Sequence, residues 1–275
     1  MKERVTLTID NDVLQRVDEL IDGTEIKNRS HAVELLLTKS LSYRKPRKAL
    51  ILAGGKSSRI KNKDMPSCLM TIHNRPILEH LLDLFKKFDI KDILIAIGSN
   101  GKPIKEYFGS GLQFGVRITY LEESHPLGTA GPLNMAKPYL TEPFIMCNGD
   151  ELKNINLNDL YAFHNNNAGI ATIALTTTDD PSSYGVALLD GNKIITFVEK
   201  PNKENSLSNL INAGLYIMNP EVLNFVPDGF AQLEQDVFPK LAHQHKLFGY
   251  VFSGQWFDTK TPEKLKKAEK DWKEL

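Results

Sequence analysis

The chain has 275 residues, of which 41% are hydrophobic, and this is enough to bury the core of one sizeable domain and a small additional unit. Its 34 lysines and arginines balance its 34 aspartates and glutamates, so no global charge indicates a nucleic-acid or membrane partner, and any such contact must come from a local patch. No apolar run approaches membrane-spanning length, the N-terminus lacks the apolar core of a signal peptide, and Cys68 and Cys147 have no metal-ligand spacing, so we expect a cytoplasmic protein without a membrane partner.

The first 43 residues follow a strand-helix-helix pattern. Residues 2–9 alternate polar and apolar side chains, which is typical of a half-buried strand. Two apolar stripes at helical spacing follow, the first capped by Asp10 or Asn11 and the second by Asn28 or Ser30. A unit this small cannot enclose a core alone, because its single strand has no neighbour and it buries little surface. The pattern therefore predicts a partner chain, and hence a homodimer.

Over residues 2–41 this pattern resembles the ribbon-helix-helix DNA-binding family, in which two chains pair their strands into a ribbon that lies in the major groove. The resemblance implies that outward strand residues contact bases and that the N-terminus of the second helix holds a backbone phosphate. The DNA-binding residues implied in this way are Arg4, Thr6, Thr8, Asn28, Arg29 and Ser30. The alternative is a dimerisation ribbon whose polar face is only solvated. Residues 44–48 form a basic linker to a second domain at residues 49–275.

A small-residue turn, Leu52-Ala53-Gly54-Gly55, follows the first strongly apolar run of this second domain, and Arg59 comes four residues later. Glycine lets backbone N–H groups approach an anion, and a guanidinium offers a planar fork to phosphate oxygens. The turn is therefore a candidate phosphate site. Taken alone, the same residues are equally consistent with an ordinary tight turn.

The second domain alternates apolar runs with helical stretches. The apolar runs cover residues 49–53, 93–97, 144–147 and 170–175, and the helical stretches cover residues 76–88, 157–164 and 262–272. This alternation predicts an α/β fold with a doubly wound, mostly parallel sheet that binds ligands at the carboxyl ends of its strands. Gly54 and Asp150 each follow a predicted strand, so we expect a nucleotide to lie across the sheet there.

Eight sequence blocks follow one another in a fixed order from Lys48 to the C-terminus. They are LAGGKSSRI with the following PSCLM, RPILEHLLDLF, PLGTAGPL, CNGD, YGVALLD, FVEKP, INAGLYI and WFDTKTPE. In content and order these blocks resemble the sugar-1-phosphate nucleotidyltransferases, which join a nucleoside triphosphate to a sugar-1-phosphate. The resemblance implies a Rossmann-like fold, the formation of an NDP-sugar and pyrophosphate, and Mg²⁺ as cofactor.

The resemblance also implies roles for single residues. It implies a catalytic set of Arg59, Asp150, Lys200 and Asp258, in which Asp150 and Asp258 hold the metal. It implies a nucleotide site of Leu52, Ala53, Gly54, Gly55, Gly128, Thr129 and Gly131. It implies a sugar-phosphate site of Asn148, Gly185, Glu199, Lys200 and Asn212. The alternatives are turn and capping aspartates, a glycine-rich helix start and ordinary surface residues.

Two residues depart from the family pattern at the phosphate site. Ser57 stands where the family has glycine, and Ser67 stands where the family has lysine after the proline. The loss of one preorganised electrostatic group commonly costs about 10²- to 10³-fold in rate. Lys56, Lys61 and Lys63 lie in the same loop and are candidates to compensate for the missing lysine.

Three functions therefore stay open at this point. The first is an Mg²⁺-dependent nucleotidyltransferase that also binds DNA in a linked regulatory role. The second is a catalytically weak or inactive transcription regulator that senses a nucleotide or NDP-sugar, and the third is an enzyme whose ribbon serves only as a dimer clamp. PLGTAGPL and QLEQDVFPKLA resemble short guanylyltransferases for mannose- or heptose-type phosphates, but thymidylyl and uridylyl transfer to glucose-1-phosphate stay open.

Overall fold

The computed structural model describes residues 5–42, 45–55, 65–202, 204 and 206–274. The chain divides into two compact units, residues 1–44 and residues 45–275. Among the described residues, no helix combines the length and the apolar character needed to cross a membrane.

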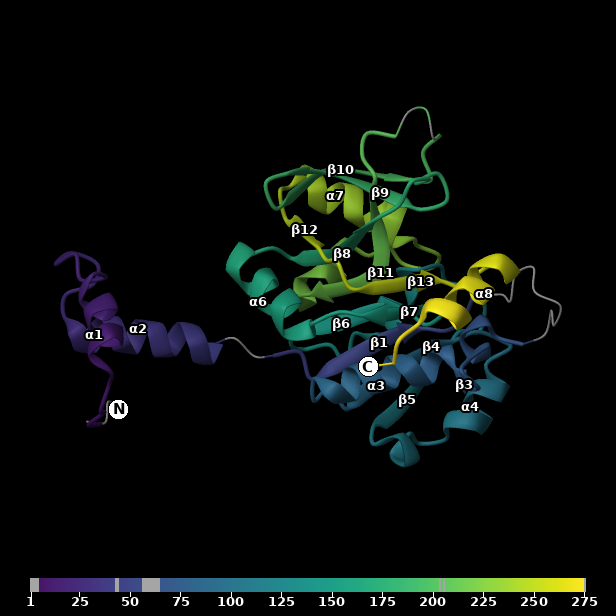
Figure 1. The fold of residues 1–275 in the computed structure, drawn as a ribbon, viewed down its shortest axis with the longest axis horizontal. Coiled ribbons are helices and arrows are strands. Elements are labelled where there is room, and N and C mark those ends of the chain that lie inside the picture. The colour runs from purple at the N-terminus through teal and green to yellow at the C-terminus, as the bar shows by residue number, and fades with distance from the viewer. Residues whose placement is uncertain (1–4, 43–44, 56–64, 203, 205, 275) are drawn as a thin grey trace. The chain divides into compact units, whose positions relative to one another are not determined.

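The small unit contains two helices, α1 (Asn11–Asp18) and α2 (Arg29–Ser42) (Figure 1). Asp10 caps α1, because its carboxylate accepts a backbone N–H of the first turn at 3.2 Å. Asn28 caps α2 in the same way, with its side-chain oxygen 3.0 Å from a backbone nitrogen of the first turn. Both predicted helices and one of the two alternatives for each cap are confirmed.

The strand predicted at residues 2–9 is not formed over the part that the structure describes. Residues 5–10 have no regular secondary structure, and residues 1–4, including Arg4, lie outside the described residues. A strand is held by hydrogen bonds to a neighbouring strand, and the described part of this unit contains no second strand. Thr6 and Thr8 therefore lie on irregular backbone in the single chain.

The large unit is built on a nine-stranded sheet with the order β5-β4-β1-β6-β11-β8-β12-β10-β9. The strands of this sheet are β1 (Lys48–Leu52), β4 (Asp92–Ile97), β5 (Arg117–Glu122), β6 (Phe144–Asn148), β8 (Ala171–Thr177), β9 (Gly185–Asp190), β10 (Lys193–Glu199), β11 (Leu210–Met218) and β12 (Leu247–Val251). Strands β5, β4, β1 and β6 pair in parallel, and β8 pairs in parallel with β12. The apolar runs predicted as strands correspond to β1, β4, β6 and β8, so these four predictions are confirmed.

The sheet as a whole is mixed, and the prediction of a mostly parallel sheet is wrong for its second half. Strand β11 runs antiparallel to both β6 and β8, and β10 runs antiparallel to both β9 and β12. A tight turn with Gly191 at φ +55° joins β9 to β10. So short a connection permits only antiparallel pairing, whereas parallel neighbours need a crossover of a dozen or more residues.

In the described part of the large unit, six α-helices accompany the sheet. They are α3 (Ile77–Lys87), α4 (Lys102–Phe108), α5 (Gly131–Ala136), α6 (Leu157–Asn167), α7 (Phe238–His243) and α8 (Pro262–Asp271). Helix α3 buries Ile77, Leu81 and Leu84, which recur at helical spacing along one face. The predicted helices at residues 76–88, 157–164 and 262–272 correspond to α3, α6 and α8, and these predictions are confirmed.

A short antiparallel ribbon joins two segments that are far apart in the sequence. It pairs β7 (Glu151–Asn154) with β13 (Gln255–Asp258), and Glu151 lies opposite Asp258. Figure 1 shows α8 beside this ribbon, and a small apolar cluster packs there around Leu152, Ala268 and Trp272. A second short pair is formed by β2 (Thr71–Ile72) and β3 (Arg75–Pro76). The β7–β13 pairing therefore fixes the position of the residues that precede β7 and follow β13.

Candidate functional site

A cavity of about 610 Å³ lies where β1, β6 and β10 end. Open α/β sheets bind ligands at this edge, the carboxyl ends of the strands. The sequence-derived site residues that line the cavity are Leu52, Ala53, Gly54, Gly55, Gly128, Thr129, Asn148, Asp150, Glu199 and Lys200. Residues from four separate sequence blocks thus meet around one space.

Two of the proposed site glycines serve packing instead of lining this cavity. A Cβ on Gly131 would lie 2.6 Å from the Cβ of Leu127, and a Cβ on Gly185 would lie 2.4 Å from the Cζ of Phe197. Such distances are shorter than real Cβ contacts, so each position admits only glycine unless its neighbour moves. Both glycines therefore act on the shape of the surrounding wall.

Asn212 is also outside the lining of the cavity. Its side-chain amide donates to the Tyr216 hydroxyl at 2.9 Å, and its side-chain oxygen accepts the backbone N–H of Gly214 at 2.8 Å. These bonds hold the irregular stretch of β11 between Asn212 and Tyr216, where the pairing with β8 shifts register. Arg59, Ser57 and the lysines of the same loop lie outside the described residues.

The glycine turn after β1 is held close against a neighbouring carboxylate. A Cβ on Gly54 would lie 2.7 Å from Oε1 of Glu123 and 3.1 Å from the backbone nitrogen of Gly98. Ala53, just before it, donates its N–H to the Ala96 carbonyl at 2.8 Å. A side chain at Gly54 would therefore displace the Glu123 carboxylate and press on the Gly98 backbone.

Glu123 was missed by the sequence reasoning, although it directly follows β5 at the ligand-binding edge of the sheet. Its carboxylate lines the cavity and accepts the backbone N–H of Leu127 at 3.0 Å, and its own N–H donates to the Ile97 carbonyl at 2.9 Å. Its place after a parallel strand is the signal that points to it.

The segment around Gly128 forms another part of the cavity wall. Gly128 has φ +78°, and a Cβ there would lie 2.3 Å from the carbonyl oxygen of Ala231. Thr129 donates its hydroxyl to Glu234 at 2.6 Å and accepts the N–H of Leu233 at 2.8 Å. Burial raises the pKa of Glu234, and the hydrogen bond from Thr129 opposes that rise. Thr129 thus fixes a second carboxylate that the sequence reasoning missed.

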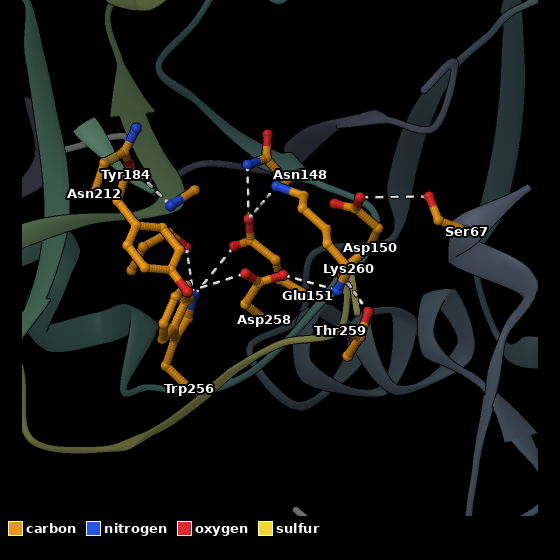
Figure 2. Close-up of polar contacts among 12 residues, drawn as sticks. Ser67, Asn148, Asp150, Glu151, Tyr184, Asn212, Trp256, Asp258, Thr259 and Lys260 are labelled. Atoms are coloured by element: carbon orange, nitrogen blue, oxygen red, sulfur yellow. Dashed lines mark hydrogen bonds and ion pairs between the residues drawn. The ribbon is translucent and has the colours of Figure 1, made fainter. Parts of the chain in front are cut away.

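The β7–β13 ribbon brings the two proposed metal aspartates to the same end of the site (Figure 2). Asp150 directly precedes β7, Asp258 is the last residue of β13, and Thr259 donates its hydroxyl to the Asp150 carbonyl at 2.8 Å. The Asp150 carboxylate faces the cavity and accepts the Ser67 hydroxyl at 3.3 Å. Burial raises its pKa, while the neighbouring Lys260 ammonium opposes that rise.

The Asp258 carboxylate, in contrast, is already bonded to two side chains and to a backbone N–H. One oxygen accepts Tyr184 at 3.0 Å and Lys264 at 2.6 Å, and the other accepts the backbone N–H of Lys260 at 2.9 Å. Burial alone would raise the pKa of Asp258, but the hydrogen bonds from Lys264 and from the Lys260 backbone outweigh it and hold the pKa below its ordinary value. Asp258 is therefore an ionised and already partnered carboxylate.

Behind Asp150 lies a buried ion pair that the sequence reasoning also missed. Lys153 and Glu151 are 3.0 Å apart, and their side chains are 0% and 4% exposed. Asn148 and Trp256 donate to the two oxygens of Glu151 at 2.9 and 3.1 Å. Burial alone would raise the pKa of Glu151, but the charges of Lys153 and Lys260 and the hydrogen bonds from Asn148 and Lys153 together lower it.

Lys200 and Lys260 bring positive charge to the cavity. Lys200 adopts φ +45°, and its ammonium lies 2.9 Å from Glu199. The ammonium of Lys260 lies 3.6 Å from Oε1 of Glu151. Burial would lower the pKa of Lys260, but the charges of Asp150, Glu151 and Asp258 raise it above its ordinary value. Lys260 follows β13 by two residues, but spacing does not reveal where so long a side chain extends.

The donor set at this edge fits a magnesium ion. Mg²⁺ prefers oxygen ligands and commonly uses only one or two protein carboxylates. Asp150 supplies a half-buried carboxylate that faces the cavity and whose pKa is raised by desolvation, so a bound cation stabilises its ionised form. Among the described residues, no group of three or more histidine, cysteine, aspartate and glutamate side chains is placed to hold a metal by itself.

Comparison with known proteins agrees with this geometry. The nucleotidyl transferase family profile matches residues 48–274. Mannose-1-phosphate guanylyltransferase catalytic subunit beta of Drosophila melanogaster is 36% identical over 222 residues, which cover 78% of this chain and 60% of that protein. Mannose-1-phosphate guanyltransferase of Eremothecium gossypii is 37% identical over 229 residues, with 78% and 62% covered. The chain thus spans about three fifths of the length of the curated relatives that it matches.

A solved structure supports the same relationship at the level of the fold. A Bacillus anthracis protein described as a glucose-1-phosphate thymidylyltransferase superposes with a TM-score of 0.75 at 26% identity, covering 82% of this chain and 96% of that one. The resemblance inferred from the eight sequence blocks is confirmed by these matches. With residues 48–274 matched by the family profile, the chain belongs to the nucleotidyl transferase family, the sugar-1-phosphate nucleotidyltransferases.

Proposed function

We propose that the chain forms an NDP-sugar and pyrophosphate from a nucleoside triphosphate and a sugar-1-phosphate. The observation that carries this proposal is the cavity at the carboxyl ends of the strands, where the glycine turn, Asp150 and Lys200 meet. Family membership supports the reaction class, and the two guanylyltransferase relatives support the kind of substrate.

In this reaction a phosphate oxygen of the sugar-1-phosphate attacks the α-phosphorus of the nucleotide. The bond between the α-phosphorus and the oxygen that bridges to the β-phosphate breaks, and pyrophosphate leaves with the electron pair. Positioning and charge neutralisation supply most of the rate. Gly55 leaves open space beside the backbone for phosphate, and Lys200 supplies positive charge for the sugar phosphate. Mg²⁺ held by Asp150 would neutralise charge on the phosphates when bound, whereas Asp258 would have to release Tyr184 and Lys264 to join it as a ligand.

Glu123 favours guanine as the nucleobase. Guanine presents two adjacent donors, its N1–H and its exocyclic amine, and a carboxylate is an acceptor that can take both. Uracil and thymine present a single N–H that lies between two carbonyl oxygens. A carboxylate repels these oxygens, because both groups are hydrogen-bond acceptors. One of the Glu123 oxygens accepts Leu127, and a carboxylate retains further acceptor sites beyond that bond.

The test is pyrophosphate release from each of the common nucleoside triphosphates against mannose-1-phosphate, glucose-1-phosphate and heptose-1-phosphates. We expect turnover with GTP, and a loss of at least about 100-fold in Asp150→Asn. Nucleotide binding is measured in parallel by calorimetry. Bound nucleotide without turnover for every pair would refute the enzyme.

A nucleotide-sensing regulator is the second candidate, and it is favoured by one contact. Ser67 places a neutral hydroxyl against Asp150, at the position where the family carries a lysine. If that exchange has removed activity, Ser67→Lys should restore pyrophosphate release to a chain that otherwise only binds nucleotide. An active wild-type chain whose rate is unchanged by Ser67→Lys excludes this candidate.

The small unit carries the second half of the proposal, which is dimerisation and DNA binding. Val17 and Ala32 are buried between its helices. Leu7, in the segment before α1, is 56% exposed and Val13 is 51% exposed, and a second copy would cover this apolar surface. Arg29, proposed for a DNA phosphate, is instead bound through two nitrogens to Asp18. A phosphate at the start of α2 would therefore depend on backbone N–H groups near Ser30.

Light scattering and duplex binding of the full chain test this half. We expect a dimer that Leu7→Asp converts to monomer, and duplex affinity that falls steeply with salt and falls further in Arg4→Ala. A dimer without salt-dependent duplex binding leaves only the clamp, and a monomeric wild-type chain refutes both roles.

A further inference from the structure

The described wall of the cavity carries more acidic than basic side chains. Each phosphate oxygen that enters it needs a positive or hydrogen-bonding partner, because like charges in a partly enclosed site repel. Among the described lining residues, the charged side chains are four acids and two lysines, namely Glu123, Asp150, Glu199, Glu234, Lys200 and Lys260. The described wall therefore has little cationic charge to offer the phosphates.

The two lysines differ in what their ammonium groups face. Lys200 lies 2.9 Å from Glu199, and its side chain is 63% exposed. Lys260 has a longer contact of 3.6 Å to Glu151, which is already paired with Lys153 at 3.0 Å. Its side chain is 46% exposed and borders the cavity. Lys260 is therefore the described lining cation with the longer ion-pair contact, and it lies among the charges of Asp150, Glu151 and Asp258.

Lys260 and Ser67 both border Asp150 at the cavity. The Ser67 hydroxyl lies 3.3 Å from the Asp150 carboxylate, and Figure 2 shows the Lys260 side chain extending alongside Asp150 toward Glu151. The backbone around Lys260 is fixed, since its N–H bonds Asp258 at 2.9 Å and the preceding Thr259 bonds the Asp150 carbonyl at 2.8 Å. The lysine is thus placed beside the aspartate by the same ribbon that places the aspartate.

We propose that Lys260 binds the phosphates of the nucleoside triphosphate and supplies the positive charge that Ser67 does not. The inference rests on the proposed function, because it assigns a residue to the triphosphate of that reaction. When the nucleotide binds, the Lys260 ammonium leaves Glu151 for a phosphate oxygen. Glu151 then keeps Lys153, Asn148 and Trp256 as partners.

The experiment measures the affinity of the full chain for GTP by calorimetry, with and without Mg²⁺, so that no turnover is needed. We expect Lys260→Met to weaken GTP binding about 10- to 100-fold, the effect of one charge-assisted hydrogen bond. Because the charge is what matters, Ser67→Lys in the Lys260→Met background should recover at least about tenfold. The wild-type affinity should fall more with added salt than that of Lys260→Met.

Controls separate this role from a structural one. Lys270→Met removes a charge from the exposed face of α8, away from the cavity lining, and should leave the affinity unchanged. The thermal midpoint of each variant reports folding. Unchanged GTP affinity in Lys260→Met, an equal loss in Lys270→Met, or a loss that Ser67→Lys does not relieve would each overturn the inference. A wild-type chain that binds no nucleotide would instead refute the proposed function.

Discussion

Replacing Lys153 with methionine tests whether the buried ion pair behind Asp150 supports the fold. Lys153 is fully buried, 3.0 Å from a Glu151 carboxylate that is itself only 4% exposed. Methionine keeps much of the volume of lysine and removes the charge. The variant leaves Glu151 with the hydrogen bonds from Asn148 and Trp256 and the more distant Lys260.

Removing one partner of a buried pair typically costs about 3–5 kcal/mol, because the remaining charge is left in a poorly solvated site. Lys260, 3.6 Å from Glu151, offsets part of that cost, so we expect a loss near the lower end, about 3 kcal/mol. For a domain of this size, each kcal/mol lowers the thermal midpoint by about 2–4 °C, so the shift should be about 6–12 °C. Glu151→Gln combined with Lys153→Met removes both charges and should recover at least about half of the loss.

The assay is thermal and urea unfolding of the wild type, the two single variants, the double variant and Lys270→Met. The Lys270→Met control should stay within about 0.5 kcal/mol of the wild type, as is usual for exposed positions. If Lys153→Met costs no more than this control, or if the double variant is less stable than Lys153→Met alone, the pair does not stabilise the fold as argued.

Three further predictions follow from single contacts. Gly128→Ala should lower stability by at least about 1 kcal/mol and weaken nucleotide binding, because its Cβ would lie 2.3 Å from the Ala231 carbonyl at φ +78°; a neutral result in both unfolding and calorimetry would contradict the close packing. Burial lowers the pKa of His164 below its ordinary 6.5. The free energy of unfolding should therefore be independent of His164 above pH 6.5 and should fall as the pH drops below 6.5, because the unfolded chain then binds a proton that the folded chain does not. Urea unfolding at a series of pH values should show that His164→Gln loses this dependence on pH. Trp256→Phe should lower the free energy of unfolding by about 1–3 kcal/mol more than Trp272→Phe does. The reason is that the Trp256 indole donates to Glu151, whereas the buried Trp272 nitrogen has no partner among the described residues. Equal losses in urea unfolding would show that the Trp256–Glu151 hydrogen bond does not contribute to stability.

The residues that the sequence placed correctly are those whose position depends on local pattern. Gly54 and Asp150 each follow an apolar run, and the run predicts both the strand and the edge of the sheet at which the residue emerges. The caps at Asp10 and Asn28 depend on the same short range, since a capping side chain bonds backbone within its own first turn. Local pattern therefore predicted β1, β4 and β6 of the parallel half of the sheet and the place of Gly54 and Asp150, whereas the other predicted wall residues came from the family resemblance.

What could not be predicted depends on contacts between distant segments. Strand β11 lies antiparallel between β6 and β8, and no periodicity within its nine residues states its direction. Gly131 matches a sequence block for nucleotide binding, yet its missing side chain makes room for Leu127. The strand at residues 2–9 has an alternating pattern, but the hydrogen bonds that would form it need a second strand.

Stability and chemistry meet in the β7–β13 ribbon. The pairing of Glu151 with Asp258 aligns the end of the CNGD block with the end of WFD, and in doing so it sets Asp150 and Lys260 side by side at the cavity. The same ribbon carries the buried Lys153 beside Leu152, which packs in the apolar cluster with Ala268 and Trp272, so a buried charge and an apolar cluster both support the site. Substitutions that loosen this pair should therefore disturb the position of Asp150 before they unfold the sheet, because the two strands of the ribbon pair only with each other among the described strands, while the nine-stranded sheet has its own core.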